Sequence, residues 1–92
     1  MARTVPRPFT MPWGSGLVVE EATTVGEHHE PTLQLLEDED GSETIRFCSY
    51  THRGSFQRSP LLLGLEDVAG LRASLRDAPR LRRALRRLVD GN

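Results

Sequence analysis

Two patterns in the second half of the chain constrain its fold most: an alternating hairpin comes first and an amphipathic helical segment comes last. Thr44 to Thr51 alternates as a half-buried β-strand does, which places Ile45 and Phe47 together on one face. Arg46 and Tyr50 then fall on the opposite face. The alternation therefore predicts a strand whose Phe47 side belongs to the core.

The second strand of this hairpin is predicted over Phe56 to Leu63. Arg53-Gly54-Ser55 supplies the turn before it, because glycine adopts the backbone conformations that tight turns need. Pro60 lies inside the predicted strand and has no N–H to donate to a neighbouring strand. It therefore indicates either a bulge or a position at the edge of the sheet.

Two more strands are predicted earlier in the chain. Leu17 to Thr24 is rich in residues that favour strands, and it ends at the turn signal Val25-Gly26. Thr32 to Glu37 follows a polar loop and carries alternate leucines on one face. Asp40-Gly41 comes next, and Asp-Gly between two alternating segments is a strong hairpin signal. Together with the later hairpin, these segments make four antiparallel strands.

The helical segment carries two apolar stripes separated by a proline. Val68, Leu71 and Leu75 follow the i, i+3, i+7 spacing of one helix face. Pro79 inside a helix would cost roughly 3 kcal/mol, whereas at a first turn it costs little. We therefore expect the helix to be kinked or split near Pro79. A second stripe, out of phase with the first, follows it: Leu81, Leu85 and Leu88.

The predicted fold class is therefore α+β, with a four-stranded antiparallel curved sheet followed by a C-terminal helix (β-β-β-β-α). Residues 17–90 form this single domain, and the helix can cover one face of the sheet. Residues 1–16 contain three prolines and two glycines and are expected to form a proline-rich N-terminal arm. Phe9, Met11 and Trp13 alternate, so the arm either lies extended along the domain or packs Trp13 onto the core.

Length and composition limit the class of protein. The chain of 92 residues is long enough for one domain with a modest core. It has no apolar run of the roughly 18 residues that a membrane span needs, and its N-terminus lacks the apolar stretch of a secretory signal. The single cysteine, Cys48, excludes an internal disulfide and fits a reducing compartment. We therefore expect a cytoplasmic protein that makes no contact with membranes.

The charges are unevenly distributed although the formal net charge is only −1. Residues 14–45 contain nine acids and no arginine or lysine, whereas residues 46–60 contain three arginines and no acid. Residues 72–92 contain seven arginines and only two acids. Such a molecule either presents a basic face to a polyanion or pairs with itself, the acidic front of one chain against the basic end of another. The arginines of the helix are otherwise an ordinary solvated face.

The hairpin is the candidate site for nucleic acid because it interleaves arginines with aromatic residues. Proteins that bind single strands need cations along the phosphates and aromatic faces on which bases stack. The alternative is a structural hairpin, with its aromatic rings in the core and its arginines solvated. The predicted nucleic-acid-binding residues are Arg46, Tyr50, His52, Arg53, Phe56 and Arg58.

The strand end SPLLL at residues 59–63, a short turn and the helix EDVAGLRASLRDAPRLRRALRRL together resemble the positive cofactor four family. These proteins are transcriptional coactivators that bind single-stranded DNA, and the resemblance, which extends to compact bacterial relatives, covers about residues 17–88. It implies a homodimer formed through the C-terminal helix, with a concave basic surface for single-stranded DNA or RNA. The chain differs from the family in its acidic first two strands and in having Val68 or Leu71 where the family helix often carries an aromatic residue.

Catalytic and metal chemistry find little support in the residue pattern. His28, His29, Cys48 and His52 have no recognised ligand spacing, so no metal site is predicted. The acidic run at residues 37–40 lacks the pattern of a calcium loop. No pattern places a nucleophile beside a base, and no glycine-rich phosphate loop is present, so we expect neither catalysis nor a cofactor.

The leading functional hypothesis is a non-enzymatic, homodimeric single-stranded nucleic-acid-binding protein, with transcription-associated regulation as the role considered for it. The main alternative is a protein–protein interaction module that does not bind nucleic acid. A third reading is a small-molecule binder that uses the space under the helix.

Overall fold

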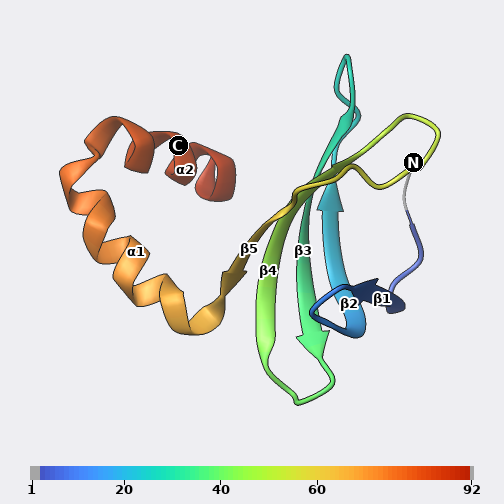
Figure 1. The fold of residues 1–92 in the computed structure, drawn as a ribbon. Helices are drawn as coiled ribbons and strands as arrows, with labels where there is room; N and C mark the ends of the chain where they lie inside the picture. The colour runs from blue at the N-terminus through green and yellow to red at the C-terminus, as the bar shows by residue number, and fades with distance from the viewer. Residues whose placement is uncertain (1–2, 92) are drawn as a thin grey trace.

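The computed structural model describes residues 3–91 and has an α+β fold, in which an antiparallel sheet precedes a C-terminal helical region (Figure 1). The strands pair in the order β1-β2-β3-β4-β5, so each strand lies beside its neighbour in the chain. The strands are β1 (Arg7–Met11), β2 (Gly14–Thr23), β3 (Glu30–Asp38), β4 (Glu43–Tyr50) and β5 (Leu61–Gly64). The helical region comprises η1 (Leu65–Asp67), α1 (Val68–Ser74), η2 (Leu75–Asp77) and α2 (Pro79–Asp90).

The sheet has five strands, so the prediction of four was wrong. The additional strand is β1, which lies within the segment expected to form a proline-rich N-terminal arm. It pairs antiparallel with β2, and Phe9 lies opposite Gly16. Because β1 is at the edge of the sheet, it needs hydrogen bonds on one side only and therefore tolerates Pro8. The proline-rich composition hid a strand because prolines are common both at sheet edges and in loops.

The hairpin turn predicted at Asp40-Gly41 is present. Gly41 has φ 87°, its N–H donates to the carbonyl of Asp38, and β3 and β4 pair without interruption from Glu37↔Glu43 to Glu30↔Tyr50. A positive φ favours glycine, so Asp40-Gly41 fits this turn well.

The second hairpin differs from the prediction in the length of its last strand. Only Leu61–Gly64 forms β5, whereas the segment before it is a loop with a single bridge between Tyr50 and Phe56. Ser59 has φ 63° and is followed by Pro60, so neither residue continues a regular ladder. The turn at Gly54, with φ 91°, is present as predicted.

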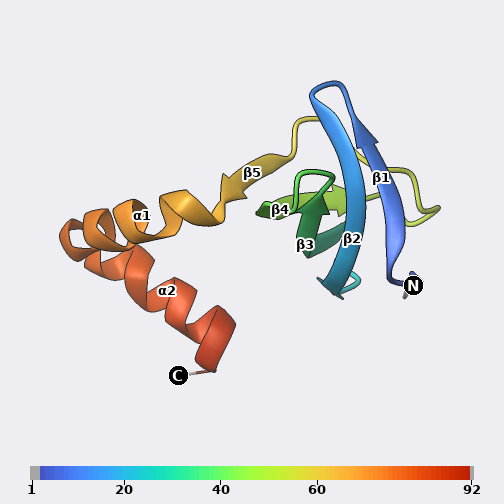
Figure 2. The same cartoon turned by 90° about the horizontal axis from the view of Figure 1, so that it is seen from below.

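The two faces of the sheet are buried in the opposite sense to the prediction. Phe47 is only half-buried, whereas Arg46 and Tyr50 on the other face are 4% and 7% exposed. The reason is a bulge in β2 between Val18 and Glu20, since bulges bend a strand. β2 runs alongside β3 in Figure 1 and is strongly curved in Figure 2, where β1 lies beside it. The small core on this face consists of Phe9, Val18 and Leu36, with Met11 and Leu62 packed against it.

The helical region is divided at the proline. α2 begins with Pro79 in its first turn, and it ends at Gly91, which has φ 77° and donates its N–H to the carbonyl of Arg87. The expected cover of the sheet is missing, because no residue of α1 or α2 is buried. Leu85 is the least exposed leucine of α2 at 36%, and Leu88 is 61% exposed. α1 extends away from the sheet beyond β5, and α2 then turns back (Figures 1 and 2).

Candidate functional site

The six residues predicted to bind nucleic acid do not form one surface. Arg46 and Tyr50 are buried on the face of the sheet that β1 covers. Phe56 is 37% exposed and packs edge-on against the Tyr50 ring, with 5.4 Å between ring centroids. The exposed members of the set are His52, Arg53, Phe56 and Arg58.

Arg46 is part of the interior. Its Nε donates to Gln34 Oε1 at 2.6 Å, and its guanidinium carbon lies 4.6 Å from the Phe56 ring centroid and 5.5 Å from that of Phe9. A guanidinium over aromatic faces is stabilised by their quadrupoles. The guanidinium of Arg46 therefore contacts the two aromatic rings and the amide of Gln34. Because the side chain is buried, a phosphate at the protein surface cannot contact it.

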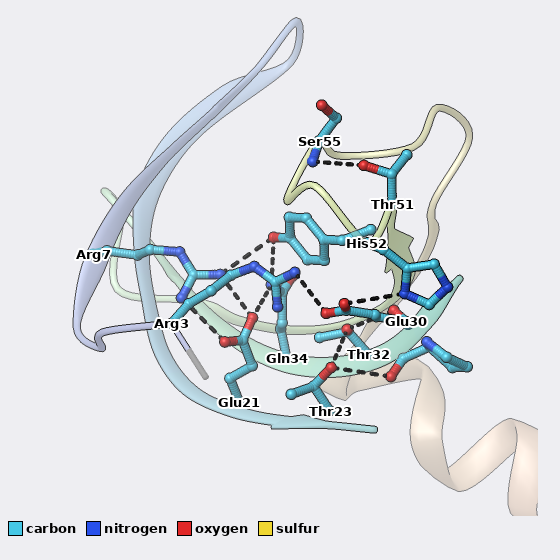
Figure 3. A network of polar contacts seen from close by, with 12 residues as sticks. Arg3, Arg7, Glu21, Thr23, Glu30, Thr32, Gln34, Thr51, His52 and Ser55 are labelled. Carbon is cyan, nitrogen blue, oxygen red and sulfur yellow. Dashed lines mark hydrogen bonds and ion pairs between the residues drawn. The ribbon is translucent and has the colours of Figure 1, made fainter. Parts of the chain in front are cut away.

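Tyr50 belongs to a polar network that joins the N-terminal segment to three strands. Figure 3 shows how Arg3, Arg7, Glu21, Glu30 and Gln34 of this network lie. The Tyr50 hydroxyl accepts hydrogen bonds from Gln34 Nε2 at 2.9 Å and from Arg7 Nη2 at 3.2 Å. The guanidinium carbon of Arg3 lies 3.6 Å from the centroid of its ring. Arg3 on the ring and Phe56 beside it leave Tyr50 unavailable for stacking a base in this arrangement.

Glu21 gives the network its first buried carboxylate. It accepts two hydrogen bonds from Arg7, at 3.2 and 2.7 Å, and one from Gln34 Nε2 at 2.7 Å. Burial by itself would raise the pKa of Glu21, but these donors outweigh it and hold the pKa below its ordinary value. The same hydrogen bond to Glu21 raises the pKa of Arg7, so both groups are charged near neutral pH.

Glu30 is the second carboxylate of the network, and its side chain is only 5% exposed. It accepts a hydrogen bond from Arg3 at 3.3 Å, and it lies 3.4 Å from Nδ1 of His52. Burial opposes its ionisation, but contacts that include His52 and the charge of Arg3 lower the pKa of Glu30 overall. His52, predicted to contact nucleic acid, is thus directed toward a carboxylate.

The sequence interpretation missed the network members outside the hairpin: Arg3, Arg7, Glu21, Glu30 and Gln34. The only available signal was a pair of arginines in the arm opposite a chain segment rich in acids. This signal does not identify partners, because the bulge in β2 decides which side of the strand Glu21 occupies.

The opposite face of the sheet is apolar and uncovered; we call it the apolar sheet face. The strand register places Leu33 opposite Phe47, and Ile45 between Leu35 and Leu63. On this face lies a groove of about 580 Å³, whose lining includes Leu33 and Phe47 of the face and Pro60 from the loop before β5. The residues of the apolar sheet face are Ala22, Leu33, Leu35, Ile45, Phe47, Leu61 and Leu63. Exposed carboxylates lie at one end of this face: Glu20, Glu37 and Glu43.

α2 is divided lengthwise into an apolar and a basic half. At about 100° per residue, its apolar residues gather on one arc and its arginines on the other. The apolar arc is Leu81, Ala84, Leu85, Leu88 and Val89. The basic arc is Arg80, Arg82, Arg83, Arg86 and Arg87. All ten residues are exposed, and within residues 3–91 no arginine of the basic arc forms an ion pair. Leu88 alone among them lines the groove on the apolar sheet face.

The described residues give little support for a metal site, a nucleophilic cysteine or a membrane-spanning helix. Residues 3–91 contain no group of three histidine, cysteine or acidic side chains that could hold a metal ion. Burial raises the pKa of the Cys48 thiol, which disfavours the thiolate needed for nucleophilic chemistry. Among the same residues, no helix has the length and apolar character required to span a membrane.

Comparison of the chain with protein-family models, curated protein sequences and solved structures gives no match. The proposals below therefore rest on the geometry of this chain.

Proposed function

We propose that this chain is a non-enzymatic protein-interaction module that acts as a homodimer. Each α2 places its apolar arc on the apolar sheet face of the other chain. One observation carries the proposal: a single chain presents two uncovered apolar surfaces, one on a sheet and one on a helix. Contiguous apolar surface of this kind marks interaction sites in soluble proteins. The free cysteine, Cys48, agrees with a cytoplasmic location for such a module.

The energetic argument concerns α2 first. A helix of 12 residues is marginal by itself in water, and its stability in proteins comes mainly from packing its apolar side. Complete burial of one leucine contributes roughly 1.5–3 kcal/mol. Leu81, Leu85 and Leu88 are between 36% and 61% exposed, so most of this contribution is available to a partner.

The charges match the same pairing. Glu20, Glu37 and Glu43 lie at one end of the apolar sheet face, and arginines flank the apolar arc of α2. When the apolar arc of α2 packs against the leucines of the apolar sheet face, the arginines that flank the arc come close to the acidic end of that face. A second copy suits these surfaces because each chain supplies one of each, and a two-fold axis then satisfies both at once.

The test is the mass of the protein in solution. Size-exclusion chromatography with light scattering is expected to give twice the chain mass of 10.3 kDa for the wild type. Leu85→Glu is expected to give a monomer, because it places a charge on the apolar arc. Val25→Glu is the matched control, since Val25 is a 64% exposed loop residue outside both surfaces.

A mixture of two variants separates reciprocal exchange from other dimers. Leu85→Glu disables the helix surface, and Phe47→Glu disables the sheet surface, so each variant alone is expected to be monomeric. Mixed together, they retain one intact helix–sheet contact and are expected to form a heterodimer. A wild-type monomer, or a mixture that stays monomeric although both variants are folded, contradicts the proposal.

Single-stranded nucleic-acid binding, in a transcription-associated role, is the second candidate function. It is favoured by the basic arc of α2, which stays at the surface when the apolar arc is covered, and by the exposed Arg53 and Arg58. DNA or RNA would then contact these arginines rather than Arg46 and Tyr50.

Fluorescence anisotropy with a labelled oligonucleotide at low salt tests this candidate. Binding should weaken steeply with salt, because each neutralised phosphate releases counterions. Arg82→Glu combined with Arg83→Glu should weaken binding further, whereas Arg3→Ala should leave it unchanged. Undetectable binding, or an affinity that does not change with salt, would contradict nucleic-acid binding as a second function.

A further inference from the structure

The arginines of α2 border its apolar arc along the whole length of the helix. At about 100° per residue, Arg80 and Arg87 lie along one side of the arc and Arg82 and Arg86 along the other. The one acid of this helix, Asp90, is its last residue. The carboxylates beside the apolar sheet face, by contrast, lie at one end of that face. The charge on α2 therefore matches a continuous anionic surface more closely than it matches the sheet.

The apolar arc is open to solvent, and α2 is attached to its own chain at one end. Leu81, Leu88 and Val89 are each more than half exposed. Among residues 3–91, no hydrogen bond or ion pair joins α2 to a strand, and the chain reaches α2 through β5 and α1 (Figures 1 and 2). Only Ala78, with a non-helical φ of −131° and ψ of 65°, separates η2 from α2. Rotation at this residue reorients α2 while the sheet stays unchanged.

A helix of this composition suits the boundary between lipid headgroups and acyl chains. Helices that lie in this boundary combine an apolar side with a strongly basic side and have low overall hydrophobicity. Arginine stems lie along apolar surface while their guanidiniums reach outward, where they form paired hydrogen bonds with phosphate. The expectation that the chain makes no contact with membranes was drawn partly from the lack of a spanning segment. A helix that lies in the plane of the membrane needs no such segment.

We propose that α2 binds membrane surfaces rich in anionic lipids, with its apolar arc among the upper acyl chains and its arginines on the headgroups. The apolar arc distinguishes this ligand from nucleic acid, because a phosphate backbone in water offers no apolar surface to cover Leu81, Leu85 and Leu88. The inference goes beyond the proposed homodimer and does not rest on it. Both use the apolar arc, so the monomer is the form that binds the membrane.

Co-sedimentation of the full chain with vesicles tests the inference. Phe47→Glu is used because it disables the sheet surface of the dimer and leaves α2 intact. It should bind vesicles of phosphatidylcholine and phosphatidylserine at least about tenfold more tightly than vesicles of phosphatidylcholine alone, since each arginine near an anionic surface adds attraction. High salt should weaken binding to the mixed vesicles, because salt screens exposed charges.

Two changes in the Phe47→Glu background separate the contributions of the two arcs. Leu85→Glu should weaken binding to the mixed vesicles at least about tenfold, because it places a charge on the arc that enters the acyl chains. Arg82→Glu combined with Arg86→Glu should remove the preference for phosphatidylserine. Val25→Glu is the matched control, since Val25 is an exposed loop residue outside α2, and it should leave the affinity unchanged.

Equal binding to the two kinds of vesicle, or binding that Leu85→Glu leaves unchanged, overturns the proposal. A wild-type dimer together with no vesicle binding by Phe47→Glu also overturns it, and leaves the homodimer standing. If the homodimer fails instead, the wild type is a monomer and should bind the mixed vesicles as tightly as Phe47→Glu does. Should Phe47→Glu not fold, wild-type protein diluted until it is monomeric replaces it in every comparison.

Discussion

At the scale of single residues, Tyr50 connects parts of the chain that lie far apart in sequence. Its hydroxyl accepts hydrogen bonds from Arg7 in β1 and from Gln34 in β3, and its ring carries Arg3 and packs against Phe56. A buried polar group must keep its partners, because an unpaired donor costs about 1–3 kcal/mol. The interior of this small sheet therefore depends on polar contacts as much as on its short apolar core.

Gly16 permits the close approach of β2 and β3. A Cβ atom at this position would overlap the carbonyl oxygen of Glu37, which belongs to the backbone and cannot rotate away. We expect Gly16→Ala to lower the free energy of unfolding by about 1–3 kcal/mol. Gly14→Ala is the matched control, because its Cβ would meet nothing within 4 Å. Urea denaturation measures both, and equal stability of the two variants would refute the steric argument.

At the scale of elements, α2 contrasts with β3. The strand pairs on both sides and includes the buried Leu36, whereas every described residue of the helix is exposed. An element with few buried contacts opens readily and exchanges its amide hydrogens quickly. The order of α2 therefore depends on what covers its apolar arc.

Hydrogen exchange measures this dependence. In the wild type at concentrations that favour the dimer, the amides of α2 are expected to exchange slowly. In Leu85→Glu they are expected to exchange at least about tenfold faster, while those of β3 keep their protection. Rapid exchange of α2 in both proteins would show that nothing covers the helix, and uniform loss of protection would show that the substitution unfolds the domain.

At the scale of the whole molecule, the buried carboxylates link stability to pH. The pKa of Glu21 is lowered in the folded protein, mainly because the hydrogen bonds from Arg7 and Gln34 outweigh the effect of burial. A lowered pKa means that the unfolded chain binds protons more readily. The resulting stabilisation is therefore present above the ordinary value of 4.5 and is lost as the pH falls through the lower folded value.

We therefore expect the free energy of unfolding to decrease steadily as the pH is lowered from about 5.5 toward the folded pKa of Glu21. Glu21→Gln removes this contribution, so its stability should be lower at pH 7 and should change less over the acidic range. Glu27→Gln, whose side chain is 87% exposed, should follow the wild-type curve. Chemical denaturation at a series of pH values provides the measurement, and parallel curves for Glu21→Gln and wild type would exclude the linkage.

Local signals predicted the features that depend on a few neighbouring residues. Gly41 and Gly54 make the expected turns because their positive φ values are accessible to glycine, and α2 begins at Pro79 because proline cannot continue a helix interior. The prediction drawn from the alternation of β4 was also correct about which residues share a face. It was wrong about which face is buried, since that depends on where β1 lies.

By itself, the sequence determined the turns, the helix division, the amphipathic character of α2 and the α+β order, because all of these follow from short-range backbone preferences and periodicity. Only the tertiary structure decided that Arg46 and Tyr50 are interior, that Arg3 and Arg7 meet buried carboxylates, and that α2 remains uncovered. The physical reason is the bulge between Val18 and Glu20. It bends β2, places β1 over one face of the sheet, and leaves the other face open.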